Sequence, residues 1–185
     1  DRLKKQKIGI VIKQDTLENQ VNAAYLSVGS NLGNKIINIE KAKYLLEANS
    51  ISIIKCSSYY ESPSWPNNNY PPYYNIVIKV KTNLLPSELF IEITKIEKYL
   101  GRVKTKKNKP RTCDIDIIDF NGKIYSFKIN NDFIEIPHPR LTERNFVLIP
   151  LFEINKKWLH PKNKKKISHL INKLDVKPLS SIKQI

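Results

Sequence analysis

The sequence of 185 residues contains no methionine, only two cysteines and no long apolar run. Because methionine is absent, residue 1 is not expected to be a native start, and residues upstream of it are expected to be missing. Cys56 and Cys113 are too few for a disulfide framework or a zinc site. No stretch approaches the roughly 18 to 20 apolar residues of a membrane span, and Lys13 and Asp15 interrupt the only early signal-peptide candidate. These absences favour a reduced, soluble, cytoplasmic protein with no membrane partner.

Positive charge is in large excess, with 32 Lys and Arg residues against 17 Asp and Glu residues and a formal net charge of +15. This charge favours polyanionic partners, namely RNA, DNA, anionic lipid or a phosphorylated small molecule. Basic residues gather at 102–111 and at 156–166. General lysine-rich composition also explains the second cluster, whereas the first directly precedes a pair of carboxylates. With 41% hydrophobic and 26% charged residues, a chain of this length predicts one domain with a sizeable core.

The hydrophobic periodicity alternates between strand and helix patterns along the chain. The pattern predicts, in order, a strand at 23–28, a helix at 36–49, a β-rich run at 51–60, a strand at 75–81, a helix from Pro86 to Gly101 and a strand at 113–118. This β-α-β-β-α-β order is typical of the ferredoxin-like α+β fold, an antiparallel sheet with helices packed on one face. We expect a single compact domain with mobile loops, and an opposite sheet face that stays free for loops and a ligand.

Smaller features complete this prediction. Apolar residues at helical spacing predict two buried stripes, formed by Ile36, Ile39, Ala42 and Leu46 in the first helix and by Leu89, Ile93, Ile96 and Leu100 in the second. Beyond the core we expect a β pair at 123–127 and 132–136, a helical turn from Leu141, a segment containing Pro150 and a short helix at 167–174. The expected organisation is an N-terminal extension (1–20), the domain (21–175) and a C-terminal tail (176–185).

Asp114 and Asp116 are the strongest candidates for a chemical role. Side chains alternate along a strand, so both carboxylates lie on one face while Cys113, Ile115 and Ile117 lie on the other. Two carboxylates about 6 to 7 Å apart repel each other, unless a divalent cation lies between them. Oxygen ligands without His or thiolate indicate Mg²⁺. The alternative is an exposed strand edge with two solvated acids, but the basic loop just upstream favours binding of a transferring phosphoryl group.

The segment 136–146 carries a second set of candidates. His138 follows a strand end between two prolines, where a structural hydrogen bond is the alternative to a catalytic role. Arg140 and Arg144 are four residues apart and could face one anion together. Phe146 is a core residue by default, although a ring beside an arginine pair could also stack on a base.

An aromatic, proline-stiffened loop follows Tyr59 and ends at Asn75. Such a loop suits a flat heterocycle, and the asparagine side chain offers the donor and acceptor that a pterin or purine edge requires. A surface loop with incidental aromatics is the alternative.

Six motifs occur in the order of one enzyme family, and they are Gly29-Ser30-Asn31-Leu32-Gly33, Tyr60-Glu61-Ser62-Pro63, Tyr73-Tyr74-Asn75, Gly101-Arg102, Pro110-Arg111-Thr112-Cys113-Asp114-Ile115-Asp116 and Pro137-His138-Pro139-Arg140. Over about residues 23–174 the chain resembles the 6-hydroxymethyl-7,8-dihydropterin pyrophosphokinases of folate biosynthesis. The resemblance implies a compact ferredoxin-like domain that transfers the β,γ-diphosphate of ATP to the hydroxymethyl group of the pterin and releases AMP.

The resemblance also implies roles for individual residues. Asp114 and Asp116 would bind two Mg²⁺ ions and would be catalytic together with Arg102 and Arg111. The implied ATP-binding residues are Glu97, Arg102, Lys104, Arg111, Ile117, His138 and Arg144. The implied pterin-binding residues are Ser62, Pro63, Trp65, Tyr73, Asn75, Asp114 and Phe146, with Tyr73 and Phe146 on either side of the ring. The expected partners are ATP and 6-hydroxymethyl-7,8-dihydropterin, without nucleic acid, and the expected state is a monomer.

The sequence departs from the family pattern in two places. Many members carry Arg-Trp-Gly where Lys107-Asn108-Lys109 precedes Pro110 in this chain. Thr94 occupies the position in the second helix near the nucleotide that is usually polar.

Two other hypotheses remain open. A basic RNA-binding module is one of them, although the chain lacks the Gly-Phe-x-Phe strand signature. The other is a domain cut from a multifunctional folate enzyme.

Overall fold

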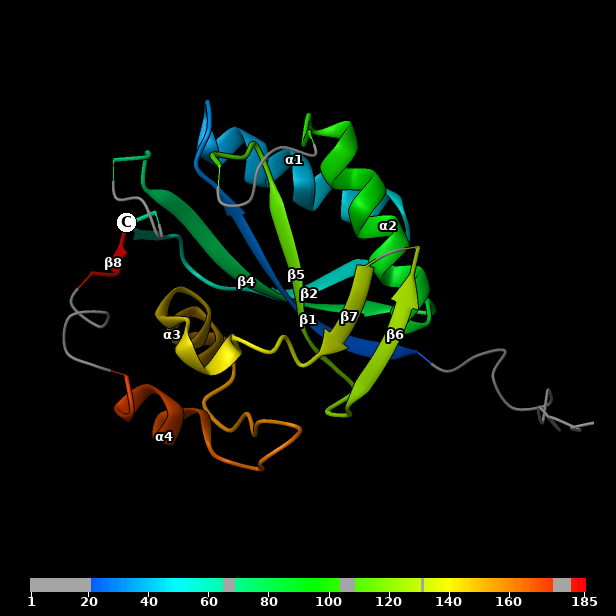
Figure 1. The fold of residues 1–185 in the computed structure, drawn as a ribbon, viewed down its shortest axis with the longest axis vertical. Helices are drawn as coiled ribbons and strands as arrows, with labels where there is room; N and C mark the ends of the chain where they lie inside the picture. The colour runs from blue at the N-terminus through cyan, green and yellow to red at the C-terminus, as the bar shows by residue number, and fades with distance from the viewer. Residues whose placement is uncertain (1–20, 65–68, 104–108, 131, 175–180) are drawn as a thin grey trace, which may run out of the picture.

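A central antiparallel sheet organises the chain in this computed structural model, which describes residues 21–64, 69–103, 109–130, 132–174 and 181–185 (Figure 1). Its elements are β1 Asn22–Ser30, α1 Lys35–Ala48, β2 Ser52–Cys56, β3 Tyr60–Ser62, β4 Tyr73–Thr82, α2 Pro86–Tyr99, β5 Asp114–Phe120, β6 Tyr125–Ile129, β7 Asp132–Ile136, the 3₁₀ turn η1 Leu141–Glu143, α3 Asn145–Ile154, α4 Ile167–Asn172 and β8 Lys183–Gln184. The strand order is β5-β1-β4-β3-β8, with β2 also paired to β4. The predicted ferredoxin-like antiparallel fold is confirmed.

Helices α1 and α2 cover one face of the sheet, above it in Figure 1. Buried residues of α1 and α2 pack with those of β1, β4 and β5 in one cluster. Asn34 caps α1 as its side chain accepts a hydrogen bond from the Ile37 amide at 3.1 Å. Both apolar stripes form as predicted except at Ile36, which lies in the first turn of α1 and is 46% exposed.

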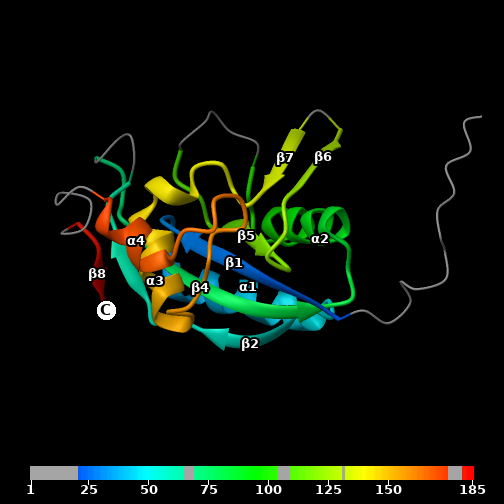
Figure 2. The same ribbon diagram turned by 90° about the horizontal axis from the view of Figure 1, so that it is seen from below.

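Helix α3, with α4 packed against it, covers part of the opposite face, so that face is not wholly free as predicted (Figures 1 and 2). Leu148 and Leu151 of α3 are fully buried in a second cluster that includes Val77 of β4 and Ile118 of β5. Trp158 anchors the chain beyond α3, because its indole N–H donates to the buried Asp119 at 2.6 Å. Pro150 concealed α3 in the sequence: it lacks an amide hydrogen, but the apolar burial of its neighbours keeps the helix.

The β-rich run at 51–60 is not one continuous strand. The register shifts between Ile53 and Lys55, and residues 57–59 between β2 and β3 belong to no strand. Glu153 of α3 stabilises this interruption, since its carboxylate accepts hydrogen bonds from the amide and the hydroxyl of Ser58. Strand β3 is consequently a separate three-residue segment that pairs with β4 and β8.

Of the extension and the tail predicted at the two ends of the chain, the structure describes residues 181–185. The extension predicted at 1–20 lies outside the described residues. Residues 181–185, predicted to belong to a tail, instead add strand β8 to the sheet beside β3. Among the described residues, no helix combines the length and hydropathy that a membrane crossing requires.

Candidate active site

The two carboxylates of β5 lie on the same face of the sheet, as the alternation predicts. Cys113, Ile115 and Ile117 belong to the cluster beneath α1 and α2, so Asp114 and Asp116 project toward the other side, where α3 begins. Their side chains are partly exposed, at 27% and 32%. A ligand can therefore reach both carboxylates.

Three guanidinium groups surround these carboxylates. Arg102 and Arg111 each contact Asp114 Oδ1, at 3.0 and 2.8 Å. Arg144 contacts Asp116 Oδ2 at 2.5 Å. The repulsion expected between the two acids is thus compensated by arginines in this structure, and the same cations can turn to an incoming polyanion.

Glu97 of α2 lies behind this cluster rather than in it. It is 5% exposed, pairs with Arg102, and accepts a hydrogen bond from the Ile115 amide at 2.7 Å. Burial raises the pKa of Glu97 to about 7, while the nearby Arg102 guanidinium acts in the opposite direction. The Glu97 carboxylate therefore orients the Arg102 side chain and strand β5. Direct contact between Glu97 and ATP stays a prediction.

The segment after β7 brings three of the predicted residues to the carboxylates. His138 lies near Asp116 and Arg144, and burial lowers the pKa of its imidazole. Arg144 lies 5.7 Å from the ring centre of Phe146. Arg140 pairs with Glu143 at 3.5 Å, and the expectation that Arg140 and Arg144 face one anion together stays a prediction.

A row of residues across the sheet connects the carboxylates to the predicted pterin side. Asp114 on β5 pairs with Gly29 on β1, and Gly29 pairs with Asn75 on β4. Directly paired residues point to the same face, and two strand spacings separate the outer two by about 10 Å. Gly29 allows the Asn75 and Tyr73 side chains to lie close over β1, because a Cβ there would come within 2.9 Å of Asn75 Oδ1 and 3.4 Å of Tyr73 Cδ1.

Asn75 is buried and its orientation is fixed. Its Nδ2 donates to Ser62 Oγ at 2.9 Å, across the β3–β4 pair. Pro63 follows Ser62 at the exposed end of β3. Tyr73 opposes Ser62, and burial raises the pKa of its phenol. These four predicted pterin residues therefore gather at one end of β3 and β4.

Asn31 is a residue that the sequence analysis left without a role. Its side chain donates to Ser64 Oγ at 3.1 Å and to the Pro71 carbonyl at 3.2 Å, and it accepts from the Arg111 amide at 2.7 Å. It is 2% exposed. Asn31 thus ties the loop after β3 to the segment before β5. Its presence in the Gly-Ser-Asn-Leu-Gly motif was the only signal available.

Thr112 also comes from a motif and received no role. Among the described residues, its Oγ1 is the buried side-chain polar atom without a hydrogen-bond partner. It lines a cavity of about 110 Å³ together with Arg102 and Arg111. An unpaired hydroxyl beside two arginines is consistent with a polar ligand at this end of the sheet.

Of the remaining predicted residues, one has a side chain that points away from the carboxylates and two lie outside the described residues. The Ile117 side chain is buried in the cluster beneath α1 and α2, so only its main chain could contact ATP. Trp65 and Lys104 lie outside the described residues, as do Lys107 and Asn108 of the atypical loop.

The carboxylate pair fits Mg²⁺ in its chemistry. Among the described residues no group of three or more His, Cys, Asp or Glu side chains could hold a metal. Mg²⁺, however, usually takes only one or two protein carboxylates and completes its octahedron with water and substrate phosphates. Asp114 and Asp116, accessible and on one face, are such a pair.

Comparison with known proteins identifies the family. The model of the family 7,8-dihydro-6-hydroxymethylpterin-pyrophosphokinase (HPPK) matches residues 25–156. The chain belongs to the HPPK family. It is 37% identical over 161 residues to the 2-amino-4-hydroxy-6-hydroxymethyldihydropteridine pyrophosphokinase of Aquifex aeolicus, covering 87% of this chain and 98% of that protein. The resemblance drawn from the motifs is confirmed.

Other HPPK relatives are much longer than this chain. The Folic acid synthesis protein fol1 of Pneumocystis carinii is 40% identical over 169 residues, which cover 90% of this chain and 22% of the relative. The crystal structure of wild-type Plasmodium falciparum HPPK-DHPS with pterin and p-hydroxybenzoate superposes with a TM-score of 0.72 at 19% identity, over 91% of this chain and 46% of that one. This structure supports the fold alone.

Proposed function

We propose that this chain transfers diphosphate from ATP to the hydroxymethyl group of 6-hydroxymethyl-7,8-dihydropterin and releases AMP, a reaction of folate biosynthesis. The hydroxymethyl oxygen forms a bond to the β-phosphorus of ATP as the bond from that phosphorus to the α–β bridging oxygen breaks. The hydroxyl proton is lost, and AMP is the leaving group. Family membership supports the proposal.

The observation that carries the proposal is the row Asp114–Gly29–Asn75 across three adjacent strands. In it, a charged group suited to phosphate chemistry lies about 10 Å from an oriented, neutral amide suited to a heterocycle edge, with no side chain on the glycine between them. This separation matches a reaction that joins a polyphosphate to a flat ring.

The nucleotide side consists of Arg102, Arg111 and Arg144, with His138 nearby. We propose that these arginines leave their carboxylate partners and bind the triphosphate, so that positioning and charge neutralisation lower the barrier. Asp114 and Asp116 would then hold two Mg²⁺ ions. A metal held by these two carboxylates would supply charge neutralisation and a lower pKa for the attacking hydroxyl.

The pterin side consists of Asn75, Ser62 and the rings of Tyr73 and Phe146. Asn75 uses one amide hydrogen on Ser62, which leaves its carbonyl and second hydrogen for the donor and acceptor edge of the ring. Tyr73 and Phe146 belong to different elements, β4 and α3. We propose that the ring lies between them.

The test is the product of a reaction with the full chain, ATP, Mg²⁺ and the hydroxymethyl pterin. We expect AMP and a diphosphorylated pterin in equal amounts. The 6-methyl analogue is the matched control, since it lacks the accepting hydroxyl and should give no AMP. ADP as the product, or no pterin-dependent AMP from folded protein, would refute the proposal.

The RNA-binding alternative is weaker than this proposal. An RNA-binding sheet needs an open face on which bases stack, whereas α1 and α2 cover one face of the described sheet and α3 covers part of the other. Binding to random RNA that falls with salt would support the alternative. The number of magnesium ions, the monomeric state and the cytoplasmic location stay predictions.

A further inference from the structure

The last five described residues connect two parts of the proposed pterin site. Ser181 Oγ accepts a hydrogen bond from Asn145 Nδ2 at 3.2 Å, at the start of α3. At the other end of this segment, the Ile185 amide donates to the Tyr59 carbonyl at 3.0 Å, just before β3. Gln184 also donates to Ser58 Oγ at 3.0 Å. The segment therefore spans from α3 to the edge of the sheet.

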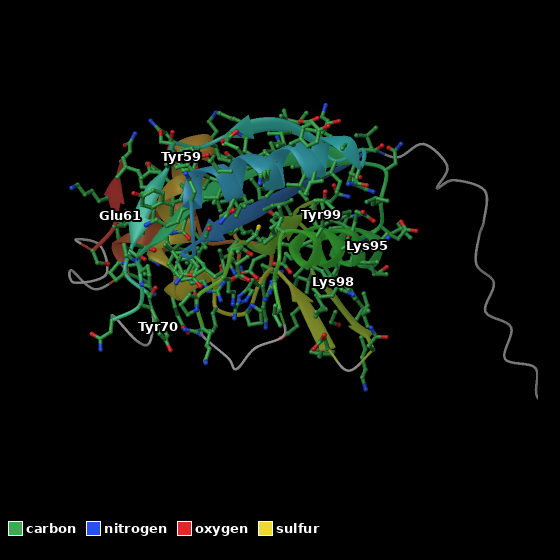
Figure 3. All side chains as sticks on the ribbon, turned by 90° about the horizontal axis from the view of Figure 1, so that it is seen from above. Tyr59, Glu61, Tyr70, Lys95, Lys98 and Tyr99 are labelled. Atoms are coloured by element: carbon green, nitrogen blue, oxygen red, sulfur yellow. The ribbon has the colours of Figure 1, made fainter. Side chains whose placement is uncertain are left out.

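Strand β3 depends on this segment for its second neighbour. It has three residues and pairs on one side with β4 and on the other with β8, where Glu61 opposes Lys183. Figure 3 shows Glu61 at this edge, beside β8 and far from Lys95 and Lys98 of α2. A strand this short is held weakly by one neighbour alone, so β8 restricts the motion of β3.

Both attached elements carry proposed pterin residues. Ser62 ends β3 and orients Asn75 by its hydrogen bond. The Asn145 side chain accepts a hydrogen bond from the Phe146 amide at 2.7 Å. This bond fixes the start of α3, which carries the Phe146 ring. The segment 181–185 therefore touches β3 and the start of α3 at once, in addition to the direct hydrogen bond from Tyr60 of β3 to Glu153 near the end of α3.

We infer that the segment 181–185 is a positioning element, which fixes β3 and the start of α3 relative to each other and so preorganises the pterin pocket. The inference rests on the proposed function. Strand β8 lies beyond the residues that the HPPK family model matches, 25–156. Preorganisation raises affinity because the pocket then need not be ordered by the ligand.

The test uses two double variants at the same positions of β8. One removes the backbone hydrogen bonds to β3, and the other removes the side chains alone. The double variant Lys183→Pro/Ile185→Pro eliminates two backbone donors, including the one to Tyr59. The double variant Lys183→Ala/Ile185→Ala loses the same side chains and keeps the donors. Dissociation constants are measured by fluorescence for the pterin, at saturating α,β-methylene ATP and Mg²⁺, and for the nucleotide analogue alone.

We expect the proline variant to bind the pterin about fivefold more weakly, with nucleotide affinity within twofold of wild type, and the alanine variant to match wild type. Unchanged pterin affinity in the proline variant would overturn the inference. Equal weakening of both ligands, or the same loss in the alanine variant, would also overturn it, since either result indicates general destabilisation.

A milder variant covers the case in which the proline variant fails to fold. Ser181→Ala removes the acceptor for Asn145 Nδ2, and we expect it to weaken pterin binding about twofold to threefold, again without an effect on the nucleotide; no change would then overturn the inference. A wild-type chain that binds no pterin would instead refute the proposed function. The two failures are therefore distinguishable.

Discussion

The nucleotide side and the pterin side of the site are held together by different forces. On the nucleotide side, Asp114 and Asp116 form ion pairs with arginines and remain partly exposed to water. On the pterin side, Asn75 and Asn31 are at most 3% exposed and are linked to their neighbours by hydrogen bonds between uncharged groups. One side is charged and accessible, and the other is neutral and buried.

The difference indicates how each side meets its substrate. Partly exposed ion pairs contribute little to stability, so Arg111 and Arg144 can exchange a carboxylate for a phosphate at small cost, whereas Arg102 also pairs with the buried Glu97. A buried amide that loses its partner pays a desolvation penalty of about 1 to 3 kcal/mol, so the pterin side must be formed before its ligand arrives. We expect mutations on the two sides to affect different kinetic constants.

The largest effect is expected from the carboxylate pair. Asp116→Ala should lower kcat at least a thousandfold, and Asp114→Ala nearly as much, because charge neutralisation of the phosphates depends on both. AMP formation at saturating ATP measures this loss. Asp132 is an exposed aspartate of β7, and the control variant Asp132→Ala should leave kcat unchanged. Rates like those of the wild type in both variants would remove the metal argument.

A smaller and more selective effect is expected at Asn75. Asn75→Ala should weaken pterin binding about a hundredfold, since two ligand hydrogen bonds at about 1 to 1.5 kcal/mol each are lost. Affinity for the ATP analogue should change less than twofold. Fluorescence titrations give both constants, with the exposed Asn83→Ala as control. If Asn75→Ala weakened both ligands equally, the division into two sides would be wrong.

The smallest effect concerns Glu97, which connects to the charged side from within the core. Its folded pKa of about 7 lies above the usual 4.5, so the folded state binds more protons between these values. The contribution of Glu97 to the free energy of unfolding is therefore complete below pH 4.5, and it is lost as the pH rises through about 7. Between pH 5 and pH 8 the wild type should lose about 1 to 2 kcal/mol more unfolding free energy than Glu97→Gln. Urea denaturation at both pH values checks this, and parallel losses would contradict it.

The sequence predicted those features that depend on local periodicity. Alternation on one strand was sufficient to place Asp114 and Asp116 on a common face, and helical spacing identified the buried stripes of α1 and α2. The order of the motifs was sufficient to identify the family. These features need no knowledge of which segments meet.

The remainder depends on contacts between distant segments. Asn31 gains its role only when residues 33, 40 and 80 positions away converge on it. Helix α3 was missed because Pro150 opposes a helix locally, while burial of Leu148 and Leu151 against the sheet stabilises it. Strand β8 has no apolar pattern of its own and takes its conformation from β3.

In the proposed function, Gly29 limits how closely the two substrates can approach each other. Because residue 29 has no side chain, the Asn75 and Tyr73 side chains can lie over this part of β1. A methyl group here would come within 2.9 Å of Asn75 Oδ1 and would turn the amide away from the proposed pterin. The separation of the two proposed substrates is then set by the spacing of hydrogen-bonded strands, a length that changes at other positions cannot easily alter.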